Sequence, residues 1–171
     1  IPYLSRRFGT RLPGCSITLR FVGLGQSQID QTLEEHVPLA DDVTVSSQFD
    51  GGRVDFTFSL PNDTQDDRKR LAKLKEQILE QLVDSIYADD GSTLEQCVAR
   101  LLADRGQKLA LVESASGGSL AAALATDDRS REVLAGAFVA PGEDELRRLL
   151  QIPDDRWAAG SSPSDRIGLL A

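Results

Sequence analysis

The residues best suited to chemistry lie together in a short segment, 113–119, which reads Glu-Ser-Ala-Ser-Gly-Gly-Ser. An apolar run at 109–112 precedes this segment, and an alanine-rich stretch at 120–125 follows it. A strand, a glycine turn and a helix start in this order direct backbone N–H groups and hydroxyls toward an anion or a reacting carbonyl. The segment therefore predicts either a nucleophile or an anion-binding site at this turn.

The polar side chains of this turn allow several interpretations. Ser114 or Ser116 can act as a nucleophile, or the serine hydroxyl can bind phosphate together with the N–H groups near Gly117 and Gly118. Alternatively, Ser116 is only the N-cap of a helix whose first turn needs glycine for close packing. Glu113, at the end of the strand, is either a general base or a solvated residue at the rim of the site. The spacing alone leaves these alternatives open.

No metal site or histidine-based triad is predicted. The two cysteines, Cys15 and Cys97, are far apart and lack metal-ligand spacing, and Cys97 falls on the predicted buried face of a helix. The lone histidine, His36, would have to join the serines from another module to complete a triad. The acidic residues at 63, 66 and 67 are interpreted as charges at a helix start rather than as a cation site.

Composition and charge set limits on the function. The chain has 171 residues, 40% of them hydrophobic and 27% charged, and a net charge of −8. Residues 1–13 form a basic arm, whereas the rest of the chain is acidic, so a broad nucleic-acid surface is not expected. No apolar run approaches the ~20 residues of a membrane span. With no secretory signal and only two distant cysteines, we expect a cytoplasmic protein that does not bind membranes.

The first half of the chain predicts a small α+β domain over residues 14–88. A half-buried strand at 16–22 is followed by a helix that starts at Ser27. Two alternating runs at 43–49 and 54–60, on either side of a glycine turn, predict a β-hairpin. A long helix with leucine and isoleucine at helical spacing comes next. The prediction is three strands backed by two helices.

The second half predicts an α/β domain over residues 89–171. Ser92 and Glu95 resemble a capping box that starts a helix ending near Gly106. A βαβα pattern follows, and its elements are a strand at 108–113, a helix at 117–125, a strand at 133–140 and a helix at 143–150. Both strands are continuously apolar, as parallel strands covered on both faces tend to be. Residues 158–164 are expected to be a loop. The first and last residues of the chain suggest a truncated part of a longer protein.

Three ordered segments resemble the C-terminal half of the competence/damage-inducible CinA family. Residues 18–27 are similar to the strand and glycine turn that open the KH-like middle module of that family, and residues 86–95 to its connector into the last domain. Residues 113–118 are similar to its Glu-Ser-Cys-Thr-Gly-Gly signature. The resemblance covers essentially the whole chain, and it implies a KH-like module at 14–88 followed by an amidohydrolase-type α/β domain at 89–171.

The same resemblance implies a reaction. Domains of this type are nicotinamide-nucleotide amidohydrolases, which convert the carboxamide of nicotinamide mononucleotide to the acid and ammonia without a metal or cofactor. It implies Ser114 as the nucleophile and Ser116 at the position of the family's threonine, with Glu113, Gly117 and Gly118 binding substrate. A pyridine nucleotide is the expected ligand and a homodimer the expected assembly. Relatives often also carry an N-terminal domain similar to molybdopterin-binding proteins, linked to ADP-ribose pyrophosphatase activity.

The sequence departs from this family pattern after its second strand. Where the family reads Ala-Tyr-Ser-Asn-Glu-Ala-Lys, residues 140–146 read Ala-Pro-Gly-Glu-Asp-Glu-Leu. Pro141 therefore stands at the tyrosine position and Leu146 at the position of the lysine that the resemblance implies as base. Losing a general base typically lowers the rate by a factor of about 10²–10⁴. The three acidic residues at 143–145 also add negative charge where a phosphorylated substrate would approach.

Three hypotheses follow. The first is a catalytically degenerate domain that binds a nucleotide or forms an oligomeric scaffold. The second is an active deamidase in which Lys108, or a residue beyond 171, replaces the missing base. The third is a module that binds protein or RNA through the KH-like sheet or the basic arm. RNA is the weaker partner, because residues 23–25 follow a strand and are too short for the Gly-x-x-Gly loop that KH domains use.

Overall fold

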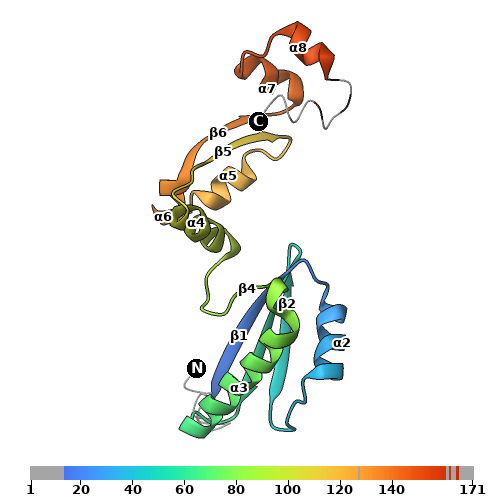
Figure 1. The fold of residues 1–171 in the computed structure, drawn as a ribbon, viewed down its shortest axis with the longest axis vertical. Helices are drawn as coiled ribbons and strands as arrows, with labels where there is room; N and C mark the ends of the chain where they lie inside the picture. Colours follow the sequence, from blue (N-terminus) through green and yellow to red (C-terminus); the bar gives the residue numbers. More distant parts are fainter. Residues whose placement is uncertain (1–13, 127, 161, 163–164, 166–171) are drawn as a thin grey trace, which may run out of the picture. The chain divides into compact units, whose positions relative to one another are not determined.

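A computed structural model describes residues 14–126, 128–160, 162 and 165 (Figure 1). The chain divides into two compact units, Ile1–Ser92 and Thr93–Ala171, and each unit is described by itself. The predicted basic arm at 1–13 lies outside the described residues, as do residues 166–171 and part of the expected loop at 158–164.

The first unit is built on a four-stranded antiparallel sheet in the order β2-β3-β1-β4. Its strands are β1 (Cys15–Val22), β2 (Thr44–Asp50), β3 (Arg53–Leu60) and β4 (Ile86–Ala88). The predicted hairpin is confirmed as β2 and β3, joined by Gly51 and Gly52 with φ of 54° and 87°. The prediction of three strands was wrong, because β4 adds a fourth strand beside β1. With only three residues, β4 is too short to show a strand periodicity.

Helices α2 (Gln26–His36) and α3 (Gln65–Leu82) close the core of this unit, and the 3₁₀ turn η1 (Val83–Ser85) leads into β4. Helix α2 begins one residue before the predicted Ser27, because Gly25 is its N-cap and donates its N–H to the side chain of Gln28. Every second residue of β3 is buried, as expected for a strand with one face on a core. The buried apolar cluster comprises Leu19, Phe21, Ile29, Leu33, Val37, Val54, Phe56, Phe58, Leu60, Leu71, Leu74, Ile78 and Leu82.

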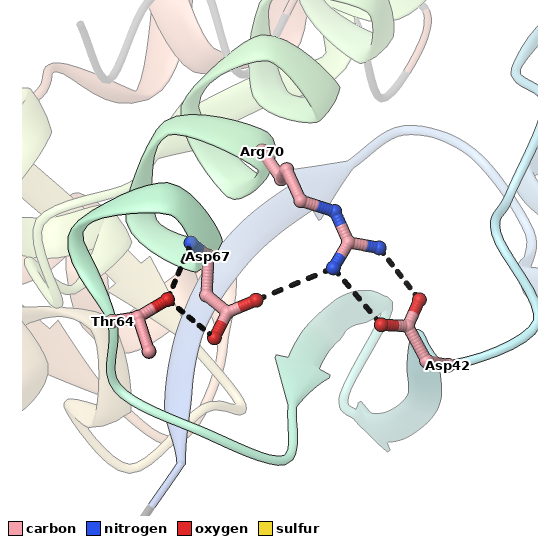
Figure 2. A network of polar contacts seen from close by, with 4 residues as sticks. All are labelled: Asp42, Thr64, Asp67 and Arg70. Carbon is pink, nitrogen blue, oxygen red and sulfur yellow. Dashed lines mark hydrogen bonds and ion pairs between the residues drawn. The ribbon is translucent and has the colours of Figure 1, made fainter.

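Asp63 and Asp67, at the start of α3, accept hydrogen bonds from neighbouring side chains, in agreement with their interpretation from the sequence. Thr64 is the N-cap, and its hydroxyl accepts the N–H of Asp67 at 3.1 Å. The Asp67 carboxylate in turn accepts hydrogen bonds from the Thr64 hydroxyl and from Arg70 (Figure 2). Arg70 also makes two hydrogen bonds, of 2.9 and 2.6 Å, to Asp42 in the segment before β2. This network ties the first turn of α3 to the start of the hairpin.

The second unit contains a two-stranded parallel sheet, formed by β5 (Leu109–Ser114) and β6 (Leu134–Ala140). Its helices are α4 (Leu94–Asp104), α5 (Ser119–Leu124), α6 (Asp128–Val133), α7 (Glu143–Leu149) and α8 (Asp154–Ala159). The predicted strand–helix–strand–helix order is present, and Cys97 is buried on α4 as expected.

Five details of the second unit differ from the predictions. Helix α4 is capped by Thr93 with Gln96, one position after the predicted pair, and α5 begins at Ser119 rather than at 117. Helix α6 was not predicted, because its six residues are mostly polar and carry no apolar period. Helix α8 extends to residue 159, where a loop was expected. Strand β6 is not covered on both faces, since Phe138 and Val139 are 42% and 40% exposed.

None of the helices in the described part of the chain combines the length and the hydropathy needed to cross a bilayer.

Candidate functional site

The turn after β5 has a strained backbone. Ala115, Gly117 and Gly118 have φ of 61°, 65° and 83°, in the left-handed region. This conformation suits glycine but costs a residue with a Cβ, such as Ala115, about 1–2 kcal/mol. The Ala115 N–H donates to the carbonyl of Ala140 at 3.3 Å and so extends the parallel ladder by one bond. The turn is thereby fixed at the carboxyl edge of the two strands, which is where ligands bind in open α/β sheets.

Glu113 anchors this turn to the helix that follows it. Its carboxylate accepts hydrogen bonds from the Ser116 hydroxyl at 2.6 Å and from the N–H groups of Leu120 and Ala121 at 3.1 and 2.8 Å. The two N–H groups belong to the first turn of α5, where the helix supplies no acceptor of its own. Glu113 is only 6% exposed. The carboxylate therefore caps α5 from the preceding strand.

These contacts correct two interpretations made from the sequence. Ser116 is not the N-cap of α5, because that position is occupied by Gly118. The Ser116 hydroxyl instead accepts the N–H of Gly118 at 3.3 Å while it donates to Glu113. Glu113 is not a solvated rim residue either, since it is buried. A carboxylate at the end of a strand and a helix that starts six residues later were the signal in the sequence that could have revealed this cap.

The electrostatics make Glu113 a weak base. The hydrogen bond from Ser116 lowers the pKa of the Glu113 carboxyl below its ordinary value, against the opposing effect of burial, and the N–H groups of Ala121 and Leu120 lower it further. The carboxylate also contacts Ser116 and not Ser114. Because two N–H groups of α5 already meet this anion, they are not available to bind a phosphate group.

A cavity of about 750 Å³ opens beside the turn. It brings together three of the predicted site residues, Glu113, Ser114 and Ser116, whereas Gly117 and Gly118 shape the turn without lining the cavity. The remaining lining residues are Ala110, Val112, Ser119, Leu120, Phe138, Glu143, Leu146 and Leu150. Of these, the apolar contributions of Phe138, Leu120 and Leu150 were missed from the sequence, because residues in apolar runs look like core.

No proton acceptor meets Ser114 within the described residues. Its side chain is exposed and lines the cavity, and its hydroxyl makes no hydrogen bond in this part of the chain. Leu146, at the expected lysine position, lines the same cavity and is 1% exposed. Pro141, at the expected tyrosine position, is exposed directly after β6.

The alternative bases within this chain are placed elsewhere. Lys108 precedes the first residue of β5, whereas Ser114 is the last, so about 20 Å of extended strand separates them. Lys108 instead donates to the carbonyl of Glu132. The hypothesis that Lys108 replaces the missing base is therefore wrong for Ser114 of the same chain. His36 belongs to the first unit, where its ring lies 3.7 Å from Glu35.

The described residues contain no group of histidine, cysteine, aspartate or glutamate side chains arranged to hold a metal ion.

The fold and the turn together define an α/β unit with a Ser-x-Ser-Gly-Gly loop at the carboxyl edge of parallel strands. Residues 91–167 match the family model described as the CinA C-terminal domain. The chain therefore belongs to the CinA family, in the part of it that contains this C-terminal domain.

Curated relatives match over most of the chain. A competence-damage inducible protein of Symbiobacterium thermophilum is 30% identical over 168 residues, which are 97% of this chain and 39% of the relative. A CinA-like protein of a Synechococcus species is 30% identical over 95% of this chain, and one of Prochlorococcus marinus is 25% identical over 98%. In both cases the match covers 39% of the relative. The chain thus spans about two fifths of the length of these relatives.

Proposed function

We propose that the second unit is a nicotinamide-nucleotide amidohydrolase-type domain that binds a pyridine nucleotide but has lost the ability to hydrolyse it. The observation that carries this proposal is the environment of Ser114, whose hydroxyl faces a cavity in which Leu146 stands at the position expected for a lysine. An alcohol without a base is a poor nucleophile at neutral pH. The second unit then serves as a binding and assembly domain.

The cavity supports binding of a small ligand. Its volume of about 750 Å³ is within the range of ~300–1,000 Å³ that small-molecule sites occupy. Val112, Leu120 and Phe138 provide apolar surface for an aromatic ring, and the hydroxyl of Ser114 provides a polar group beside it. Shape and apolar contact therefore favour the ring end of a nucleotide in this cavity.

Charge argues that the cavity holds the ring rather than the phosphate. Glu113 and Glu143 both line it, and Glu113 occupies the N–H groups at the start of α5. A carboxylate at that position repels a phosphate group and takes the donors that would otherwise bind one. We therefore expect the affinity for the whole nucleotide to be lower than the contacts of its ring alone would give.

The first unit fits the same proposal as an assembly module of KH-like type. Its turn at 23–25 leads directly from β1 into α2 and is not a loop between two helices, so it lacks the arrangement by which KH domains hold nucleic acid. We propose that this unit contributes to a homo-oligomer rather than to RNA binding.

A paired measurement on the full-length protein tests the proposal. Calorimetric titration with nicotinamide mononucleotide measures binding, and an ammonia assay on the same sample measures turnover. The proposal predicts saturable binding with no ammonia above the uncatalysed rate. Ammonia release at an enzyme-like rate that Ser114→Ala abolishes and Ser116→Ala only reduces would establish an active deamidase instead.

A further inference from the structure

Strand β2 is the outer strand of the described sheet, and its own sequence carries none of the usual protection against pairing. Within the described part of the chain it pairs only with β3, and all seven of its residues are exposed. Natural edge strands usually carry lysine, proline, a bulge or a covering segment that prevents pairing with another chain. Strand β2 contains neither lysine nor proline, and its one charge, Asp50, is its last residue.

The hydrogen-bonding groups of this edge can be assigned from the hairpin. Gly51 and Gly52 form a two-residue turn, so the flanking pair of Asp50 and Arg53 exchanges backbone hydrogen bonds. Alternation along the strand then turns the backbone groups of Thr44, Ser46, Gln48 and Asp50 toward β3. The N–H and C=O groups of Val45, Ser47 and Phe49 face the open edge.

The side chains of these three residues lie on the core face of the sheet. Their partners across the ladder on β3 are Phe58, Phe56 and Val54, which are at most 1% exposed. Val45 and Phe49 nevertheless remain 36% and 64% exposed. The apolar face of the sheet thus continues onto β2, where Val45 lines a hollow beside Leu33 of α2 and Phe49 is largely exposed.

We propose that β2 is the interface between two copies of this chain, which pair antiparallel about a two-fold axis at Ser47. In this register Val45 of each copy meets Phe49 of the other, and Ser47 meets its own counterpart. An axis at Ser47 is the only position at which every outward-facing N–H and C=O group of Val45, Ser47 and Phe49 finds a partner. This pairing forms about six backbone hydrogen bonds between the two strands. The two four-stranded sheets then become one continuous sheet.

Charge favours a second copy in this orientation. The antiparallel register places Asp50 opposite the neutral Thr44, whereas a parallel in-register pair would set Asp50 against Asp50, which is destabilising. The six residues from Thr44 to Phe49 are uncharged, so the paired strands themselves add no repulsion between two chains that each carry a net charge of −8. The sequence of β2 is complementary to a second copy of itself in this register, whereas a strand from an unrelated protein need not be complementary to it. A second copy is therefore the partner that this edge fits.

Sedimentation of the chain and its variants tests the interface. Ser47→Pro removes an outward N–H without breaking the bonds to β3, and Ser47→Ala is its matched control because it keeps that N–H. Val45→Lys places a charge on the apolar face, and Gln48→Lys places one on the opposite face. We expect dimers at tens of micromolar for the wild type and both controls, and a weakening of at least about tenfold for Ser47→Pro and Val45→Lys.

A cross-linking measurement checks the register. A short bismaleimide should link two chains through Ser47→Cys, because the two-fold axis brings these positions to about 5.5 Å between Cα atoms. The wild type, with Cys15 and Cys97, gives the background. A monomeric wild type would overturn the proposal, as would dimers that survive both disrupting variants or a Ser47→Cys yield no higher than background. The interface deepens the proposed homo-oligomer, and these outcomes do not depend on nucleotide binding, so they are separable from failure of the proposed nucleotide-binding function.

Discussion

The hydroxyl of Ser116 donates a 2.6 Å hydrogen bond to the carboxylate of Glu113, three residues earlier. The same carboxylate caps the first turn of α5, so this one contact joins the strand, the glycine turn and the helix. It also commits the Glu113 carboxylate to structure, although Glu143 lines the same cavity. The chemistry left to the site depends on Ser114.

Glu113→Gln should destabilise the second unit. The amide can accept from one N–H of α5, but its NH₂ group then faces a second donor and leaves a buried N–H unsatisfied. We expect the midpoint of thermal unfolding of this unit to fall by at least about 4 °C. Ser114→Ala is the control, because Ser114 is exposed and should leave the midpoint within about 1 °C. Equal midpoints for the two variants would contradict the capping role.

The contribution of Glu113 should depend on pH. Its folded-state pKa is lowered from the ordinary value of 4.5, so its stabilisation is complete above that value and is lost as the pH falls through the folded-state pKa. The gap in unfolding free energy between wild type and Glu113→Gln should therefore shrink between pH 6 and pH 3. Asp42 and Asp63 also have lowered pKa values, but both proteins keep them, so their effects cancel. A gap that stays constant over this range would contradict the assignment.

Ala115→Gly should stabilise the protein, although alanine-to-glycine changes usually do the opposite. Ala115 has a φ of 61°, and glycine adopts this conformation without the steric cost of a Cβ. After the greater entropy of glycine in the unfolded chain is counted, we expect a gain of up to about 1 kcal/mol in urea unfolding. Ala123→Gly, within α5, is the matched control and should cost about 0.5–1 kcal/mol. A loss for both variants would show that the turn is not strained at 115.

Leu146→Lys with Pro141→Tyr should restore turnover if the missing base is the defect. The new amine would enter the cavity that Ser114 lines, where burial lowers its pKa toward the range of a useful base. We expect ammonia release from nicotinamide mononucleotide to rise by a factor of about 10² or more, together with a loss of stability from burying the amine. Leu146→Met with Pro141→Tyr supplies the control without an amine. The mechanism would be excluded if ammonia release rose in both double variants. It would also be excluded if the rise in the lysine variant persisted after Ser114→Ala was added.

The sequence predicted those features whose signals are local. The β2–β3 hairpin follows from two alternating runs around Gly51 and Gly52, and the strand-turn-helix segment around Ser114 follows from an apolar run before a glycine turn. The buried face of α3 follows from its helical spacing of leucine and isoleucine.

Other features depend on contacts that the local pattern does not record. Strand β4 is fixed by its pairing with β1, and α6 carries no apolar period. The choice of Thr93 over Ser92 as the cap of α4 rests on which hydroxyl meets the backbone of Gln96. Glu113 was ambiguous because its burial is set by a helix that begins six residues later and folds back onto it.

We propose that the second unit binds a pyridine nucleotide without hydrolysing it. Calorimetric titration of the full-length protein with nicotinamide mononucleotide, combined with an ammonia assay of the same mixture, measures both binding and turnover. We predict a saturable heat of binding and ammonia at the uncatalysed rate. Steady ammonia release that Ser114→Ala removes, or the absence of any binding heat at millimolar ligand, would contradict it.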